Sequence, residues 1–175
     1  LVNASLNKYA GPGGWNDPDM LVVGLNGRKG PSGDLGGTGC SDIEYQSQMS
    51  LWCLMAAPLM ISCDIRNMNT ATKRILTNKD IIAIDQDMLG TQAVRHIIDD
   101  IWHIFMKPLA GGDIAVGILN ASDTTMAISA DKIFSEFPEM KFAFDVWTKD
   151  RLPVKKKMKV SIAPHETKVY RLSVQ

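Results

Sequence analysis

Residues 9–21 read Tyr-Ala-Gly-Pro-Gly-Gly-Trp-Asn-Asp-Pro-Asp-Met-Leu, and this stretch is the most informative part of the 175-residue chain. Its glycines let the main chain turn closely, while its prolines fix φ and favour extended backbone in the preceding residues, Gly11 and Asp17. We therefore expect rigid backbone here, with the Cα atoms of Asp17 and Asp19 about 6.5 Å apart. Their side chains are expected to share one face with Trp15.

Three interpretations of the two aspartates are open from these residues. A retaining glycoside hydrolase needs two carboxyl groups about 5 to 5.5 Å apart, but neighbours on one short rigid segment rarely reach opposite sides of a scissile bond. Binding of sugar hydroxyls is favoured over that role, because a carboxylate accepts strong hydrogen bonds and a tryptophan offers an apolar ring face. The Asp-Pro-Asp sequence also suits turn and helix-cap chemistry.

The composition indicates a soluble globular protein with a neutral partner. Nineteen basic and nineteen acidic residues give zero net charge, so no long-range field attracts nucleic acid or anionic lipid. No apolar run approaches the ~20 residues that span a bilayer. Three cysteines without clustered histidines give no basis for a disulfide framework or a zinc site, and we expect neither cofactor nor metal. Secreted, lysosomal and bacterial locations all stay open.

Hydropathy patterns divide the chain into two domains, 1–92 and 93–175. In the first domain, Ser41-Asp42-Ile43-Glu44 reads as a capping box that opens a helix ended by Pro58. Short apolar runs predict strands at 20–24 and 59–62. Helical spacing resumes further on and predicts helices at 70–76 and 79–84. Asp64 and Arg66 follow the second of these strands, and either line a site or form a structural ion pair.

The second domain has an almost entirely β-type pattern. Seven short strands separated by turn residues predict an antiparallel sandwich, at 93–98, 101–107, 113–119, 124–129, 142–147, 157–162 and 167–173. Its histidines, His96, His103 and His165, have no nucleophile at an interpretable spacing, so no Ser-His-Asp or Cys-His site is supported. The glycine-rich loop at 30–39 and the lysines at 155–159 are expected to be solvated surface.

The stretch 11–21 closely resembles the signature of family 27 glycoside hydrolases, the α-galactosidases and α-N-acetylgalactosaminidases. The same family's order and spacing continue through residues 40–45, 50–59, 64–66 and 84–90. A weaker resemblance extends over 105–109, 115–120, 146–147 and 163–165. Nearly the whole chain is covered.

This resemblance implies an α/β plus all-β fold, in which the C-terminal part of a (β/α)8 barrel precedes an antiparallel β-sandwich. It further implies retaining hydrolysis of terminal α-linked galactose or N-acetylgalactosamine. A full barrel takes ~250 residues, so residues 1–92 supply only its last two or three units. The family's nucleophile and acid/base aspartates are expected upstream of Leu1, which leaves no catalytic residue in this chain and predicts that it is inactive alone.

The site residues carried over from the family are Asp19 and Met20, which are expected to bind the sugar. Trp15, Asn16 and Asp17 are expected to support that wall. The expected partners are an α-galactoside or related sugar and the missing N-terminal barrel segment, from the same protein or a separate chain, and a homo-oligomer is possible. Two alternatives stay open: a galactose-type binding module without catalysis, and a β-L-arabinopyranosidase of the same family.

Overall fold

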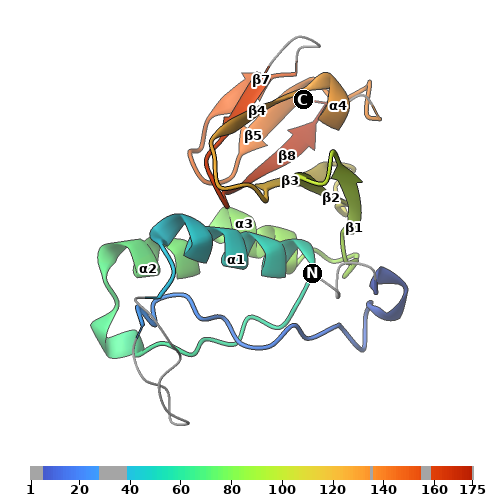
Figure 1. Cartoon of the computed structure of the whole chain (residues 1–175). Helices are drawn as coiled ribbons and strands as arrows, with labels where there is room; N and C mark the ends of the chain where they lie inside the picture. The colour runs from blue at the N-terminus through green and yellow to red at the C-terminus, as the bar shows by residue number, and fades with distance from the viewer. Residues whose placement is uncertain (1–5, 28–38, 135, 155–158, 175) are drawn as a thin grey trace.

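The computed structural model describes residues 6–27, 39–134, 136–154 and 159–174. A layer of helices separates two regions of extended chain: the N-terminal segments lie on one side of it and the β-sheets on the other (Figure 1). The expectations for loop 30–39 and for the lysine run fall largely on residues 28–38 and 155–158, outside the described ranges.

Helix α1, Asp42–Leu54, begins where the capping box predicts. The Ser41 hydroxyl accepts the Glu44 N–H, and the Glu44 carboxylate accepts the Ser41 N–H at 2.8 Å. The helix ends at Leu54, four residues before Pro58, because Ala56 adopts a left-handed φ of 51°. The expectation that Pro58 itself ends the helix was therefore wrong.

Two short helices follow close to their predicted bounds, α2 at Thr70–Leu76 and α3 at Lys79–Asp85. Asn69 caps the first by accepting the Thr72 N–H, and Asn78 caps the second by accepting the Asp80 N–H. Short 3-10 turns lie at Asn7–Tyr9 (η2) and Ile65–Asn67 (η3).

The two strands expected in the first domain are reduced to one parallel bridge between Leu21 and Ile61. The Leu21 N–H donates to the Met60 carbonyl at 2.8 Å, and its carbonyl accepts the Ser62 N–H at 3.2 Å. Helix α1 connects the two bridged segments, which gives a β-α-β unit. A longer ladder needs further neighbouring strands, and the described residues supply none.

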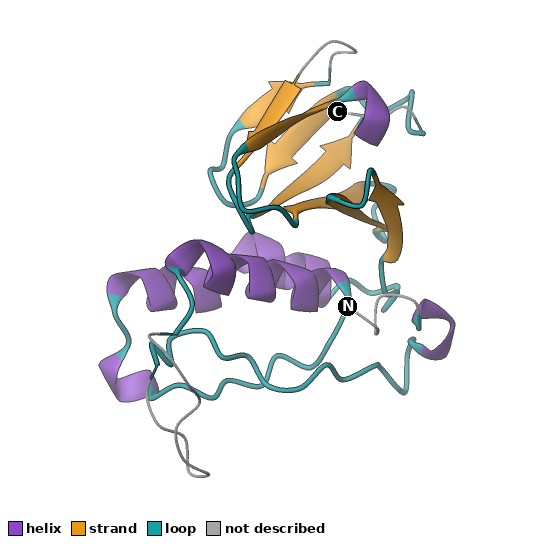
Figure 2. Cartoon of the chain, viewed as in Figure 1, coloured by secondary structure: helices purple, strands orange, loops and turns teal. Residues whose placement is uncertain are grey.

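The described residues form eight antiparallel strands in two sheets (Figure 2). Their bounds are β1 Val94–Ile98, β2 Trp102–Pro108, β3 Ile114–Asn120, β4 Met126–Ser129, β5 Phe142–Asp145, β6 Arg151–Pro153, β7 Lys159–Ile162 and β8 Thr167–Ser173. One sheet has the order β1-β2-β3-β8-β5-β6, and β4 pairs with β7 in a second. Helix α4, Asp131–Phe134, and strand β6 were not predicted, because a single helical turn and a three-residue strand are too short to show a period.

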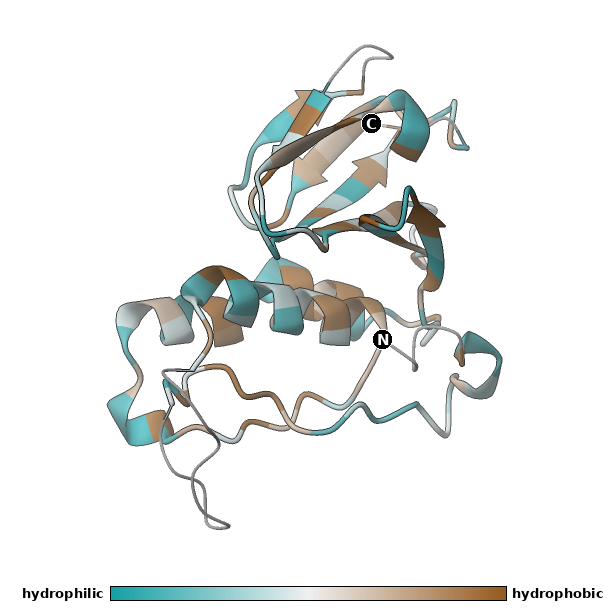
Figure 3. Ribbon diagram, viewed as in Figure 1, coloured by the Kyte–Doolittle hydropathy of each residue, from teal (hydrophilic) through white to brown (hydrophobic). Residues whose placement is uncertain are grey.

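One hydrophobic core joins the helices to the larger sheet (Figure 3). Leu54 of α1 packs in the same cluster as Phe105 of β2 and Val169 of β8. Gly117 of β3 lies directly against Leu54 of α1. A Cβ added at Gly117 would come within 2.2 Å of the Leu54 Cδ1 atom. The missing side chain therefore sets how closely helix and sheet approach.

Polar contacts also cross this interface. The fully buried Lys107 donates from Nζ to the Ile84 carbonyl in α3 at 2.8 Å. The Trp147 indole donates to the Ser50 hydroxyl of α1 at 3.0 Å. These bonds satisfy buried donors that would otherwise destabilise the interface.

Replacing Gly117 with alanine should therefore lower the free energy of unfolding by about 2 kcal/mol, because the new methyl group overpacks the helix-sheet contact. Urea denaturation measures the change. Gly111→Ala is the matched control, since its nearest neighbouring atom lies 4.0 Å from the added Cβ. Equal stability of the two variants would contradict the packing argument.

Candidate functional site

A tight turn precedes the candidate site. The backbone of Gly11 and Gly14 forms two reciprocal hydrogen bonds of 2.9 and 3.0 Å, and Gly13 between them has a φ of 101°. This backbone conformation strongly favours glycine. The turn therefore sets the direction in which Trp15 and Asn16 leave it.

Trp15 and Asn16 tie the stretch to distant parts of the chain. The Trp15 indole donates to the Gly90 carbonyl at 3.0 Å, and the Asn16 amide donates to the Leu6 carbonyl at 2.8 Å and to Gln92 Oε1 at 2.9 Å. Trp15 also lines a cavity of about 430 Å³ with Ala56–Leu59, Asp85–Asp87 and Gly90. Both side chains thus make contacts that hold the stretch in place.

Asp17 and Asp19 form a turn. The Asp19 N–H donates to Asp17 Oδ1 at 2.9 Å, which is an Asx turn, and Asp19 has a φ of 82°. The expectation of extended backbone through Asp19 was therefore wrong, because the Asp17 side chain stabilises a bend instead. Among residues other than glycine, aspartate and asparagine tolerate this positive φ best.

Asp19 and Met20 are presented outward at the start of the bridged segment. One carboxylate oxygen of Asp19 accepts the Met20 N–H at 2.7 Å. Both side chains are solvent-exposed, Met20 to 43%. The two residues that were expected to bind sugar thus lie next to each other on an open surface.

Two side chains of α1 hold the backbone of this wall, and the sequence analysis missed both. The Trp52 indole donates to the Asp19 carbonyl at 2.8 Å. The Gln48 amide accepts the Val22 N–H at 3.0 Å and donates to the Met20 carbonyl at 3.4 Å. Gln48 and Trp52 are four residues apart, and this i, i+4 spacing on the predicted helix was the available signal.

Asp64 and Arg66 form a local ion pair. The Asp64 carboxylate caps the 3-10 turn by accepting the Arg66 N–H, and its two oxygens accept the guanidinium at 3.0 and 3.2 Å. This bond raises the pKa of Arg66, whose side chain is largely exposed. Of the two roles left open for this pair, the structural ion pair is the one observed.

Asp85 is a buried acid at the wall of the Trp15 cavity. Its Oδ1 atom is inaccessible and has no hydrogen-bond partner in the described structure, and burial raises the pKa of the carboxyl to about 6. A hydrogen bond from Gln86 and the charge of Lys107 oppose this shift. Burial likewise lowers the pKa of Lys107, against the attraction of Asp85.

Within residues 6–27, 39–134, 136–154 and 159–174, no group of three or more His, Cys, Asp or Glu side chains is placed to hold a metal ion. No helix in these ranges has the length and apolarity to cross a membrane. The polar groups that the candidate wall offers are carboxylates, amides and an indole.

Two family models match the chain in consecutive order. Residues 2–87 match the model described as alpha galactosidase A, and residues 99–172 match the alpha galactosidase C-terminal beta sandwich domain. The chain belongs to glycoside hydrolase family 27. Its fold is accordingly the C-terminal part of a (β/α)8 barrel followed by an antiparallel β-sandwich, as the sequence predicted.

Individual family 27 relatives cover nearly the whole chain. An α-galactosidase of Oryza sativa is 38% identical over 94% of the chain and 37% of its own length. The structure of a candidate α-galactosidase/melibiase of Bacteroides fragilis is 39% identical, with a TM-score of 0.90 over 98% of the chain and 37% of its own. A β-L-arabinopyranosidase of Geobacillus stearothermophilus is 25% identical, with a TM-score of 0.76 over 92% and 37%. The chain thus spans well under half the length of these relatives.

The buried Asp85 makes the stability of the chain depend on pH. The folded protein keeps the proton on the Asp85 carboxyl up to about pH 6, whereas the unfolded chain releases it at about pH 3.9. Stability should therefore decrease as the pH rises between these values, by about 3 kcal/mol in full. Asp85→Asn should remove this decrease and stabilise the protein at pH 7.5, as measured by urea denaturation across the pH range.

Asp131→Asn on the short helix α4 is the matched control, because this aspartate is exposed. That variant should keep the wild-type pH dependence. A wild-type curve that is flat between pH 4 and 6.5 would contradict the burial argument.

Proposed function

We propose that this chain supplies one wall of the active site and the sandwich domain of a retaining α-galactosidase, which hydrolyses terminal α-linked galactose. The observation that carries the proposal is the outward presentation of Asp19 and Met20 from a strand-helix-strand unit of family 27. Three hydrogen bonds, from Gln48, Trp52 and the Asp19 carboxylate, hold the backbone of these two residues, so the point from which their side chains leave the wall is fixed.

The wall supports sugar binding through two different side-chain properties. The Asp19 carboxylate uses one oxygen for the Met20 N–H, and its other oxygen has no donor among the described residues. That oxygen accepts hydrogen bonds from two ring hydroxyls of the sugar. The flexible Met20 side chain packs against the apolar face of the ring. Asp17 acts through Asp19, by stabilising its turn.

In this proposal, the bond-breaking carboxylates come from the preceding part of the barrel. The relatives are more than twice as long as the chain, so their sequence includes a large segment that the chain does not match. A retaining mechanism needs a nucleophile and an acid/base about 5 to 5.5 Å apart on either side of the glycosidic bond. Asp17 and Asp19 do not suit these roles, because each uses an oxygen to hold the turn.

The preceding barrel segment also has a surface on which to pack. The bridge to Leu21 uses the Met60 carbonyl and the Ser62 N–H, so the backbone groups of Ile61 point to the opposite edge. Apolar side chains on these two segments are exposed, Met60 to 58% and Ile61 to 41%. An unpaired edge beside exposed apolar side chains suits the addition of a parallel strand.

The activity test compares residues 1–175 alone with the same chain co-expressed with a family 27 N-terminal barrel segment. The chain alone should release no p-nitrophenol from p-nitrophenyl α-galactoside, and the combination should do so. A parallel assay with the α-N-acetylgalactosaminide and the β-L-arabinopyranoside identifies the preferred sugar. Turnover by residues 1–175 alone would sink the proposal.

The binding test is a calorimetric titration of the reconstituted protein with galactose, which measures the galactose affinity. Asp19→Asn should weaken binding about tenfold or more, because it removes the charge of the acceptor while asparagine tolerates the positive φ. Asp64→Asn is the control, since this carboxylate is engaged by Arg66. Galactose affinity that is insensitive to Asp19→Asn would place sugar binding elsewhere, with the sandwich as the leading alternative.

A further inference from the structure

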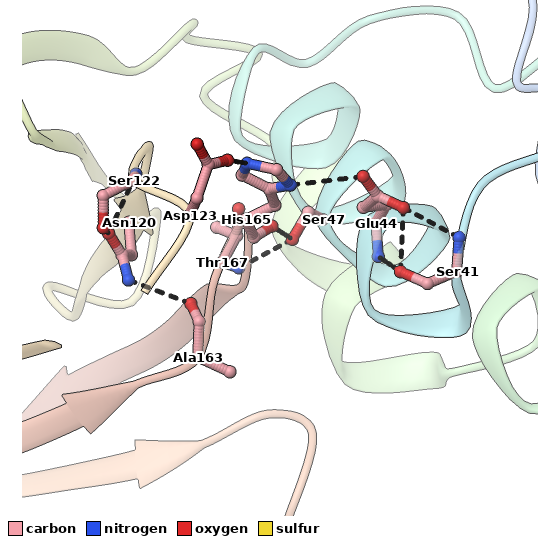
Figure 4. A network of polar contacts seen from close by, with 9 residues as sticks. All are labelled: Ser41, Glu44, Ser47, Asn120, Ser122, Asp123, Ala163, His165 and Thr167. Atoms are coloured by element: carbon pink, nitrogen blue, oxygen red, sulfur yellow. Dashed lines mark hydrogen bonds and ion pairs between the residues drawn. The ribbon is translucent and has the colours of Figure 1, made fainter. Parts of the chain in front are cut away.

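His165 lies between two carboxylates from different parts of the chain (Figure 4). Its Nδ1 atom is 3.2 Å from Glu44 Oε1 in the first turn of α1, and its Nε2 atom is 3.1 Å from Asp123 Oδ1 in the turn after β3. A carboxylate oxygen only accepts hydrogen bonds, so both contacts are satisfied together only when both ring nitrogens carry protons. The geometry therefore favours the imidazolium cation.

The backbone from His165 to Thr167 is bound to the same helix. The Ser47 hydroxyl donates to the His165 carbonyl at 2.6 Å and accepts the Thr167 N–H at 2.7 Å. Ser47 is buried, and Figure 4 shows its hydroxyl between these two backbone groups. Because Ser47 contacts the carbonyl and not the ring, these residues are not a Ser-His-Asp triad. They form a clamp between sandwich and helix.

Further along α1, two side chains hold the candidate sugar wall. Gln48 bonds the backbone of Met20 and Val22, and Trp52 bonds the carbonyl of Asp19. Glu44, Gln48 and Trp52 are spaced by four residues, so they follow each other along one side of α1. A single helix thus connects the clamp to the wall.

We propose that His165 is a positioning residue, which fixes α1 against the sandwich and through α1 fixes the backbone of Asp19 and Met20. The part of this inference that concerns sugar rests on the function proposed above for these two residues. The sandwich then contributes to sugar binding without touching the sugar. A rigid wall binds more tightly than a mobile one, because less conformational entropy is lost on binding.

Carboxylates lie around the His165 ring. They are Glu44 on α1, Asp123 after β3, and Glu166, whose carboxylate accepts the Ala163 N–H. The Ser41 bonds, together with His165, lower the pKa of Glu44. Glu44 therefore stays a charged acceptor for the His165 ring near neutral pH.

The test is amide hydrogen exchange of residues 1–175 by NMR, with the protection factor of the Val22 N–H as readout. His165→Asn should lower this protection about threefold at neutral pH, a modest effect because the ion pairs are partly exposed. Asparagine suits the positive φ of His165. Ser47→Ala should lower the protection more, because it leaves the His165 carbonyl and the buried Thr167 N–H unpaired.

His96→Asn on β1 is the matched control and should change nothing, because His96 lies on an exposed edge strand. The sheet amides of Val116 and Ile118 report general stability. If Val22 protection is unchanged in His165→Asn, or falls only in step with these sheet amides, the positioning role is wrong.

A galactose titration of the reconstituted protein separates this inference from the proposed function. Weaker galactose binding by His165→Asn, with wild-type binding by His96→Asn, supports both. If the wild type binds no galactose while Val22 protection still depends on His165, the proposed function fails and the link through α1 stands. Full galactose affinity in His165→Asn would overturn the claim about sugar.

Discussion

The close packing of α1 on the larger sheet is the contact on which the rest of the structure depends. It is possible because Gly117 leaves room for Leu54, and the core that results includes residues from both domains. With α1 fixed in this way, its opposite side is available to hold the segment around Asp19. Removing water from this one interface therefore organises both the fold and the candidate site.

Much of the fold could be predicted from the sequence, since its signals are local. The capping box located the start of α1, and the alternating pattern located β8 at Thr167–Ser173 without error. The end of α1 was missed because the left-handed φ of Ala56 has no signature in an alanine. The strands of the first domain were overestimated because a strand persists only beside its neighbours, which local sequence does not supply.

The candidate site was predicted in part. Asp19 and Met20 were identified through a family resemblance, and the structure brings them together on one exposed wall. Their supports, Gln48 and Trp52, were missed because their helical spacing shows only that they share a side of α1, and does not indicate backbone partners 26 to 33 residues away. His165 was set aside for want of a nucleophile, since its partners Glu44 and Asp123 lie 121 and 42 residues away in the sequence and are brought near only by folding.

The positive φ of Asp19 has a consequence for how this position evolves. Backbone geometry favours glycine, asparagine or aspartate here, and the proposed role as a charged acceptor would favour aspartate among the three. Backbone conformation and ligand binding therefore both constrain this one side chain. The constraint from the backbone would remain even if the ligand changed. In a descendant that no longer bound sugar, we expect asparagine or glycine at this position before any other residue.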